Sequence, residues 1–469
     1  MASGERDAGQ RQWVLALLAV CALGLAVRVG YVLNHELDDI GGDARYYHEA
    51  ANLLADGDGF VHPFYLDDGR RVPGADHPPA YQVALALPSL LGFDSVRDHQ
   101  LFSALLGTLT VGLVGLAGRQ VAGRRVGLVA AVITALYPDV WLNDGALMSE
   151  TLALLAGVLV VMAAYWCWES PSVRRFALVG AAVGFATLAR AEAALLVPLV
   201  AWPLAAWARG LDGWRPRLGR LALATGVAGL VLVPWVVPNL VRFQEPATLS
   251  TQLGPTLDVA NCDETYSGPA LGSWSFACAM ESDAVVRAHP DYDTVDRSVI
   301  DGWLTDRAIT YARDHTDRWP AVVAARLGRT VGLYAPGDQL RFDRYAENRP
   351  MSASRAGLAM FYPLAVAAIA GVVVLRRRGV PSFPLVAGIA SVLVTAVLFY
   401  GSTRFRAPAE PSIVLLAAVA VDALVRRLRG EGDGGPPARV APAAEPPLAA
   451  PEPAQTPDQT VVGQGSQRS

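Results

Sequence analysis

A polar stretch from Asp38 to Ala51 brings together residue types that could form an active site. It contains several carboxylates, two adjacent glycines, an arginine, two tyrosines and a histidine, and it follows a long apolar segment. Asp43 comes directly after the glycine pair, where the backbone can approach a substrate closely. A carboxylate at an apolar–polar boundary tends to have a raised pKa, which suits a general base. We therefore predict that Asp43 is catalytic; the structural alternative is that it caps a helix beginning at Ala44.

Neighbouring side chains could hold a substrate next to this carboxylate. Arg45, Tyr46 and Tyr47 lie within about one helical turn of Asp43 and supply a positive charge and two hydroxyl groups. His77 is followed by two prolines, which predict a rigid start to a helix. These four residues are the predicted substrate-binding groups of the first polar loop.

One further carboxylate and three arginines lie far away in the chain, next to apolar segments. Glu150 begins such a segment, and a carboxylate at the mouth of a membrane helix is a functional candidate, although helix capping would also explain it. Arg190, Arg404 and Arg406 lie at the opposite helix ends from most other arginines. Arginine binds phosphate bidentately and stays charged, so we predict that they bind a lipid-linked phosphate. The alternative is snorkelling toward the headgroups.

Long apolar blocks must position these residues. The chain has 469 residues, of which 52% are hydrophobic, and its blocks match the roughly 20 residues that cross about 30 Å of hydrocarbon. The pattern predicts an all-α polytopic membrane protein with about ten transmembrane helices. The predicted spans are residues 12–33, 99–118, 126–143, 148–168, 176–189, 193–208, 221–241, 356–375, 383–400 and 410–425.

Arginines near the predicted helix ends indicate the orientation, because cytoplasmic loops of membrane proteins are enriched in positive charge. If both termini are cytoplasmic, the arginine-rich ends, such as Arg124-Arg125 and Arg376–Arg378, all face the cytoplasm. This orientation places Asp43 and the other candidate residues on the extracytoplasmic face of a plasma (inner) membrane.

The polar regions predict how the chain is divided. The parts are an N-terminal transmembrane module (1–241) whose first outer loop (34–98) carries the catalytic Asp, an extracytoplasmic domain (242–355), C-terminal transmembrane helices (356–429) and a disordered cytoplasmic tail (430–469). Within them, short helices are predicted near 44–54, 79–91 and 301–332. Cys262 and Cys278 lie in the second outer region and would form a disulfide if that region is extracytoplasmic.

The sequence lacks the motifs that mark several other kinds of active site. No His, Cys and Asp arrangement has metal-ligand spacing, and neither a phosphate-binding glycine loop nor a serine nucleophile elbow is present. We therefore expect no cofactor, although Asp43 and Glu150 could share a divalent ion. No nucleic-acid partner is expected.

Together with the loop around Asp43, seven further segments in a fixed order support a comparison with a known family. Asp43-Ala44-Arg45-Tyr46-Tyr47 and His77-Pro78-Pro79 are followed by Gly123–Ala131, Tyr137-Pro138, Ser149-Glu150, Gly184–Arg190, Pro234-Trp235 and Arg404–Pro408. Over most of residues 10–425, this series resembles the polyprenyl-phosphate-dependent GT-C glycosyltransferases, which include the family 39 protein O-mannosyltransferases and the lipid A aminoarabinose transferases. The acidic pair usual in their first loop is Asp43-Ala44 here, so its second carboxylate is missing or is replaced by Asp38, Asp39 or Glu49.

The resemblance implies an inverting transfer of a sugar from a polyprenyl-phosphate donor to a hydroxyl of a protein, lipid or cell-envelope glycan. Asp43 would take the acceptor proton, while the outer arginines would neutralise the leaving phosphate. The expected partners are the donor, the acceptor and the lipid bilayer. A transporter or flippase of a lipid-linked or anionic solute is the alternative, and a structural scaffold of an envelope assembly is a third interpretation.

Overall fold

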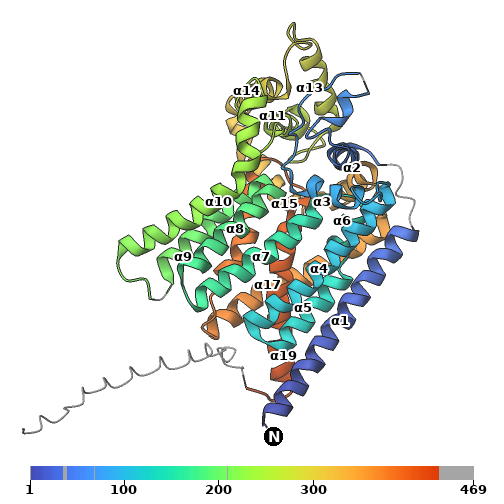
Figure 1. Ribbon diagram of the computed structural model, residues 1–469. Helices are drawn as coiled ribbons and strands as arrows, with labels where there is room; N and C mark the ends of the chain where they lie inside the picture. Colours follow the sequence, from blue (N-terminus) through green and yellow to red (C-terminus); the bar gives the residue numbers. More distant parts are fainter. Residues whose placement is uncertain (1, 35–39, 68, 209, 433–469) are drawn as a thin grey trace, which may run out of the picture.

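The computed structural model describes residues 2–34, 40–67, 69–208 and 210–432, and its regular elements are helices (Figure 1). Within these ranges the only β pairing is an isolated antiparallel bridge between Val61 and Pro73. Asp38 and Asp39 lie outside the described residues, as does nearly all of the predicted tail, from 433 onward. The predicted all-α class is confirmed.

Ten helical segments of the described chain coincide with the ten predicted spans. Six are long and apolar enough to cross a membrane, and the bent pair α5–α6 would make a seventh; the other three are shorter. The segments are α1 (Ala2–Asn34), α4 (Val96–Ala122), α5 (Arg124–Leu136) with α6 (Pro138–Gly145), α7 (Glu150–Glu169), α8 (Val173–Ala189), the series η2 (Ala191–Leu195), η3 (Val197–Ala201) and α9 (Trp202–Trp207), α10 (Trp214–Arg242), α17 (Met351–Arg377), α18 (Phe383–Leu398), and η5 (Thr403–Ala409) leading into α19 (Glu410–Leu428).

The core of the bundle lies around α7 and α19. Two thirds (67%) of the apolar window of each is buried, compared with 22% for α1 and α17 and 17% for α10. Side chains of α4, α5, α7, α17 and α19 share one hydrophobic cluster. The central helices are therefore α7, which carries Glu150, and α19, which follows Arg404, while the outer helices expose apolar side chains on the surface of the bundle.

The remaining helices lie at the end of the bundle opposite the N-terminus, which we call the loop side (Figure 1). Two of them, α2 (Gly42–Ala55) and α3 (Ala80–Ser89), confirm the short helices predicted near 44–54 and 79–91; η1 (Pro63–Tyr65) lies between them. The stretch predicted near 301–332 is divided into three helices. Residues 243–350 contain α11 (Leu253–Asp258), α12 (Asp263–Tyr266), α13 (Phe276–Arg287), α14 (Arg297–Asp314), η4 (Thr316–Arg318), α15 (Trp319–Thr330) and α16 (Pro336–Glu347).

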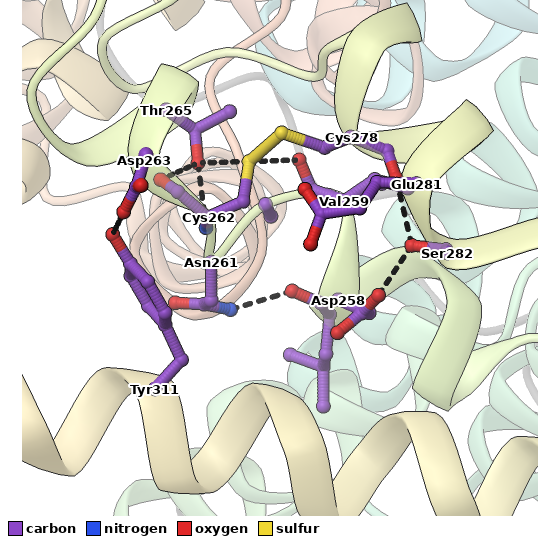
Figure 2. The surroundings of a disulfide bond; sticks show 12 residues. Asp258, Val259, Asn261, Cys262, Asp263, Thr265, Cys278, Glu281, Ser282 and Tyr311 are labelled. Carbon is purple, nitrogen blue, oxygen red and sulfur yellow. Dashed lines mark hydrogen bonds between the residues drawn. A yellow bond between two sulfur atoms is a disulfide. The ribbon is translucent and has the colours of Figure 1, made fainter. Parts of the chain in front are cut away.

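A disulfide joins Cys262 and Cys278, as the sequence predicted, and ties α12 to α13 (Figure 2). The surrounding polar groups are satisfied: Asn261 Nδ2 donates to the carbonyl of Leu257 at 2.6 Å, and Ser282 donates to the Asp258 carboxylate. The covalent link therefore lies within a buried, hydrogen-bonded part of the loop side.

Replacing both cysteines with alanine should destabilise this region. The two positions are 16 residues apart, and closing a loop of that size contributes about 3 kcal/mol by restricting the unfolded chain. We expect limited proteolysis to cleave the double variant within residues 253–314 much faster than the wild type. As a control, Cys167→Ala, at a free buried cysteine of α7, should not accelerate that cleavage; equal cleavage of the double variant and the wild type would contradict the prediction.

Candidate active site

Arg404 lies at the centre of three acidic side chains from distant parts of the chain. Its Nη2 donates to Asp43 Oδ2 at 2.8 Å and its Nη1 to Glu347 Oε1 at 3.3 Å, while its Nε donates to Glu150 Oε1. The side chains of Glu150 and Glu347 are 0% and 4% exposed, whereas that of Asp43 is 32% exposed. The arginine therefore joins two buried carboxylates to one that solvent can reach.

A close backbone contact positions Arg404. A Cβ at Gly401 would lie 2.1 Å from the carbonyl oxygen of Arg326 on α15, so only glycine lets the chain pass here. Next, the Ser402 hydroxyl accepts a hydrogen bond from the Arg404 N–H at 3.2 Å and caps η5. These two features direct the start of η5 toward the loop side, where α2 and α7 begin.

Asp43 and Glu150 lie in the first turns of α2 and α7, but neither is a helix cap. Gly41 is the N-cap of α2, and Gly42 has a φ of +51°, a conformation that favours glycine. The prediction that Asp43 could cap a helix beginning at Ala44 is therefore wrong, because the helix begins earlier. Glu150 is the first residue of α7 and points at two arginines.

Arg190 binds Glu150 from the other side. It ends α8 with an extended backbone, and its Nη1 donates to Glu150 Oε1 at 2.6 Å while its Nε donates to Glu192. One oxygen of Glu150 thus receives hydrogen bonds from both Arg190 and Arg404. Glu150, Arg190 and Arg404, three predicted site residues from distant parts of the chain, are therefore in direct contact.

His77 completes the surroundings of Asp43. Its Nε2 lies 3.4 Å from Asp43 Oδ1, on the opposite oxygen from Arg404. The ring is held by the buried Tyr46 and Tyr47, whose ring centroids lie 5.2 and 4.9 Å from that of His77. The two predicted substrate-binding tyrosines therefore surround the histidine instead of lining open solvent.

The pKa of Asp43 is shifted in the opposite direction from the one predicted. Burial alone would raise the pKa of the carboxyl, but His77 and Arg404 outweigh burial and hold that pKa below its usual range. The expected raised pKa was wrong because the sequence did not reveal that two cationic partners converge on this group. Asp43 is consequently ionised at neutral pH, which is the protonation state that a general base needs.

Two predicted substrate-binding arginines are not brought into this cluster. Arg45 Nε pairs with Glu49 at 2.6 Å and its Nη2 with Asp67 at 2.8 Å. Arg406 is buried among other partners: its Nη2 lies 2.5 Å from Asp139 Oδ2 and its Nε 3.0 Å from Glu410 Oε1. The guanidinium carbon of Arg406 also lies 3.7 Å from the centroid of the Phe361 ring.

Glu347 and Arg349 were missed by the sequence analysis. Arg349 Nε lies 2.5 Å from Glu347 Oε2, and its Nη2 donates to Asn143 Oδ1 at 2.9 Å, which links the end of α16 to α6. The available signal was a charged Glu-Asn-Arg-Pro segment directly before a long apolar helix. Asp76, beside His77, pairs with His62 and Arg297.

Two pockets adjoin the pair of arginines. The first has Arg404 in a wall of mostly polar residues and lies between α6, α16, α17 and η5. The second has Arg190 in a wall that is mostly apolar and lies between α7, α8, α18 and η5. We call them the polar pocket and the apolar pocket. Glu150, bonded to both arginines, lies between them.

Asp343 in the polar pocket gives the fold a measurable pH dependence. Burial and the neighbouring Glu347 raise its pKa to about 7, so folding favours the protonated form. The contribution of this group to stability is complete below its unfolded pKa of about 4 and is lost as the pH rises through about 7.

The variant Asp343→Asn keeps the shape of the protonated group and removes the charge. We expect its melting temperature to exceed that of the wild type at pH 8, by roughly 2 °C or more, and the two temperatures to converge as the pH falls to about 4. A constant difference at both values would contradict the raised pKa. Asp338→Asn, on the exposed side of α16, serves as the control.

Within the described part of the chain, no group of three or more His, Cys, Asp or Glu side chains is arranged to hold a metal ion.

Comparisons with known proteins show a family match over part of the chain. Residues 76–240 match the family described as dolichyl-phosphate-mannose-protein mannosyltransferase. The matched segment contains His77, Glu150 and Arg190. No curated protein sequence matches the chain.

Solved structures are similar over nearly the whole chain. The archaeal oligosaccharyltransferase AglB from Archaeoglobus fulgidus, in complex with an inhibitory peptide and a dolichol-phosphate, has a TM-score of 0.53 at 14% identity, covering 90% of this chain and 52% of AglB. The chain thus spans about half the length of AglB. ArnT from Cupriavidus metallidurans, bound to undecaprenyl phosphate, has a TM-score of 0.38 at 17% identity, covering 87% of this chain and 78% of ArnT.

Proposed function

We propose that this chain, which has the GT-C membrane fold and matches the mannosyltransferase family over residues 76–240, is a membrane glycosyltransferase. Its donor would be a polyprenyl-phosphate sugar. The observation that carries the proposal is the Arg404 cluster. In this cluster the partly exposed Asp43 pairs with Arg404, which lines the polar pocket, and Glu150 links Arg404 to Arg190, which lines the apolar pocket.

The apolar pocket suits the lipid part of such a donor. Its wall includes Val160, Leu196, Val392 and Phe405, which belong to membrane helices and η5, and Arg190 lies in the same wall. An isoprenoid chain in this pocket would lie among apolar side chains, while its phosphate would meet an arginine that stays charged. The dolichol-phosphate complex of AglB is consistent with this class of donor.

The proposed reaction is a single displacement at the anomeric carbon of the sugar. Asp43 accepts the proton of an acceptor hydroxyl, whose oxygen forms a bond to that carbon. The bond between carbon and phosphate oxygen breaks, and its electron pair leaves with polyprenyl phosphate. Arg404 and Arg190 neutralise the developing charge on the phosphate, while His77 and Arg404 orient the two oxygens of Asp43.

The proposed side of the membrane follows from the arginine distribution. The site lies on the loop side, and most arginines that flank the predicted membrane spans belong to the opposite ends of those helices. Because positive charge marks cytoplasmic ends, we assign the loop side to the extracytoplasmic space. The acceptor hydroxyl would then belong to an exported protein, a lipid or a cell-envelope glycan.

His77→Gln tests the role of Asp43 through pH. Because His77 lowers the Asp43 pKa, its removal should raise that pKa, and the base would become protonated at higher pH. We expect the acidic limb of kcat/KM to move upward from below about pH 4. His48→Gln, on the same helix as Asp43 but bonded to His99, should leave the limb in place. An unmoved limb in His77→Gln would contradict the assignment.

The function itself is tested with purified protein in proteoliposomes. Labelled polyprenyl-phosphate mannose, glucose and arabinose would be supplied together with an envelope extract as the source of acceptors. The proposal predicts that at least one sugar is transferred to acceptor material. Passage of intact labelled lipid across the bilayer without cleavage would instead favour a flippase and would overturn the proposal.

A further inference from the structure

A third cavity, which shares no lining residue with the polar or the apolar pocket, lies between α11, α12, α14, α15 and the end of α18. Its volume is about 240 Å³, many times the roughly 10–15 Å³ that one water molecule requires. Most of the residues that line it are apolar, and among the described ones Arg326 alone carries a charge. We call it the Arg326 cavity. Such a space suits a ligand that has one anionic group and an apolar body.

The Arg326 side chain is buried without an acidic partner. It is 4% exposed, and its Nη1 and Nη2 donate to the carbonyls of Val397 and Ala260, each at 2.8 Å. Nη2 also reaches the amide oxygen of Asn261 at 3.3 Å, while Nε has no partner among the described residues. All three acceptors are neutral. Burial therefore lowers the pKa of Arg326, because no carboxylate offsets the loss of water around the charge.

This arrangement differs from that of the equally buried Arg406. Arg406 pairs with the carboxylates of Asp139 and Glu410, as expected because buried charges in proteins are usually paired. Val397 lies in the last turn of α18, and the end of a helix offers Arg326 only a partial negative charge. A full negative charge next to Arg326 is the group that the cavity lacks.

The rim of the Arg326 cavity is apolar and exposed where α18 ends. Ile309, Trp319 and Leu398 line the cavity and are all exposed. Leu398 is the last residue of α18, which is one of the apolar helices of the bundle, and tryptophan is enriched where membrane proteins meet the lipid headgroups. The open side of the cavity therefore has the composition of a surface that borders the edge of a bilayer.

We propose that the Arg326 cavity binds an anionic phospholipid of the surrounding bilayer, with the headgroup phosphate at Arg326 and an acyl chain along Ile309 and Leu398. The phosphate supplies the missing negative charge, and a guanidinium group binds phosphate oxygens through strong, charge-assisted hydrogen bonds. The lipid would also brace the segment before Arg404, because Gly401 packs against the backbone of Arg326. This site lies outside the proposed reaction and does not depend on it.

The test places a carboxylate inside the cavity. Val323 lines the cavity and precedes Arg326 by three residues on α15, so Val323→Glu supplies an internal anion one helical turn from the guanidinium group. Val323→Gln has nearly the same size and no charge. Each purified protein in neutral detergent would be titrated with phosphatidylglycerol or phosphatidylcholine, and native mass spectrometry would count the bound lipids. We expect the wild type and Val323→Gln to prefer phosphatidylglycerol, and Val323→Glu to bind it about tenfold more weakly.

The control for a simple change in net charge is Val285→Glu. Val285 is exposed on α13 and does not line the cavity, so this variant should bind phosphatidylglycerol as the wild type does. Equal binding of phosphatidylglycerol by Val323→Glu and Val323→Gln would overturn the proposal. A wild type that binds both lipids equally would overturn it as well.

Thermal unfolding in lipid-free detergent separates a loss of binding from a loss of fold. Val323→Glu should be at least as stable as Val323→Gln, because its carboxylate can pair with the Arg326 cation. A clearly less stable Val323→Glu would contradict an Arg326 that lacks an anion. Sugar transfer is not among these measurements, so a failure of the proposed function would leave their result unchanged.

Discussion

Replacing Asp43 with asparagine should lower kcat/KM for sugar transfer by about 10²–10⁴-fold, the usual contribution of a general base. Asparagine keeps the size of the side chain and can still accept a hydrogen bond from Arg404, but it cannot take a proton from an acceptor hydroxyl. Binding of sugar-free polyprenyl phosphate should change little, because the proposed phosphate ligands are the arginines. Transfer rates and lipid affinity would be measured on the same purified samples.

The matched control is Asp58→Asn. Asp58 follows α2, its side chain is 37% exposed compared with 32% for Asp43, and it also pairs with an arginine, Arg71. This control should transfer sugar at the wild-type rate. Undiminished transfer by Asp43→Asn would exclude Asp43 as the base.

Replacing Arg404 with glutamine should lower the stability of the fold more than any other single substitution considered, and it should also abolish sugar transfer. The substitution leaves Glu150 and Glu347 buried with one cationic partner fewer each. Removing one member of a buried ion pair costs about 3 kcal/mol, although Arg190 and Arg349 still pair with these two carboxylates. We expect a clear fall in the melting temperature together with weaker binding of polyprenyl phosphate.

Two further variants separate the loss of charge balance from the loss of phosphate binding. Combining Arg404→Gln with Glu150→Gln removes a buried negative charge and should recover part of the stability without recovering transfer. Arg71→Gln, at an exposed pair with Asp58, should change stability by about 1 kcal/mol or less. If Arg404→Gln were as stable and as active as Arg71→Gln, the cluster would have neither the structural nor the catalytic role assigned to it.

The membrane helices and the short loop helices could be predicted because their signals are local. Apolar blocks long enough to cross a bilayer identify the spans whatever their neighbours are, and each predicted span coincides with a helical segment. The disulfide was predictable because two cysteines lie close together in one polar region. Glu150, Arg190 and Arg404 were identifiable as charged groups at the ends of apolar segments, and the structure brings them within hydrogen-bonding distance.

The remaining features depend on contacts that no local pattern reveals. Arg45 and Arg404 are both arginines in polar segments near the proposed site, yet Arg45 pairs with its own helix neighbour Glu49, whereas Arg404 reaches Asp43 across the fold. Arg406, two residues after Arg404, points toward Asp139 and Glu410 because successive residues of η5 face different sides. The lowered pKa of Asp43 is likewise a property of the assembled cluster.

The most direct test of the proposed reaction is the fate of the donor in a single turnover. Wild-type protein loaded with a labelled polyprenyl-phosphate sugar would be mixed with acceptor, and the product's anomeric configuration and the released lipid would be determined. Direct displacement with Asp43 as base predicts one polyprenyl phosphate released for each sugar transferred, with inversion at the anomeric carbon. Retention of configuration, or transfer of sugar with its phosphate still attached, would contradict it.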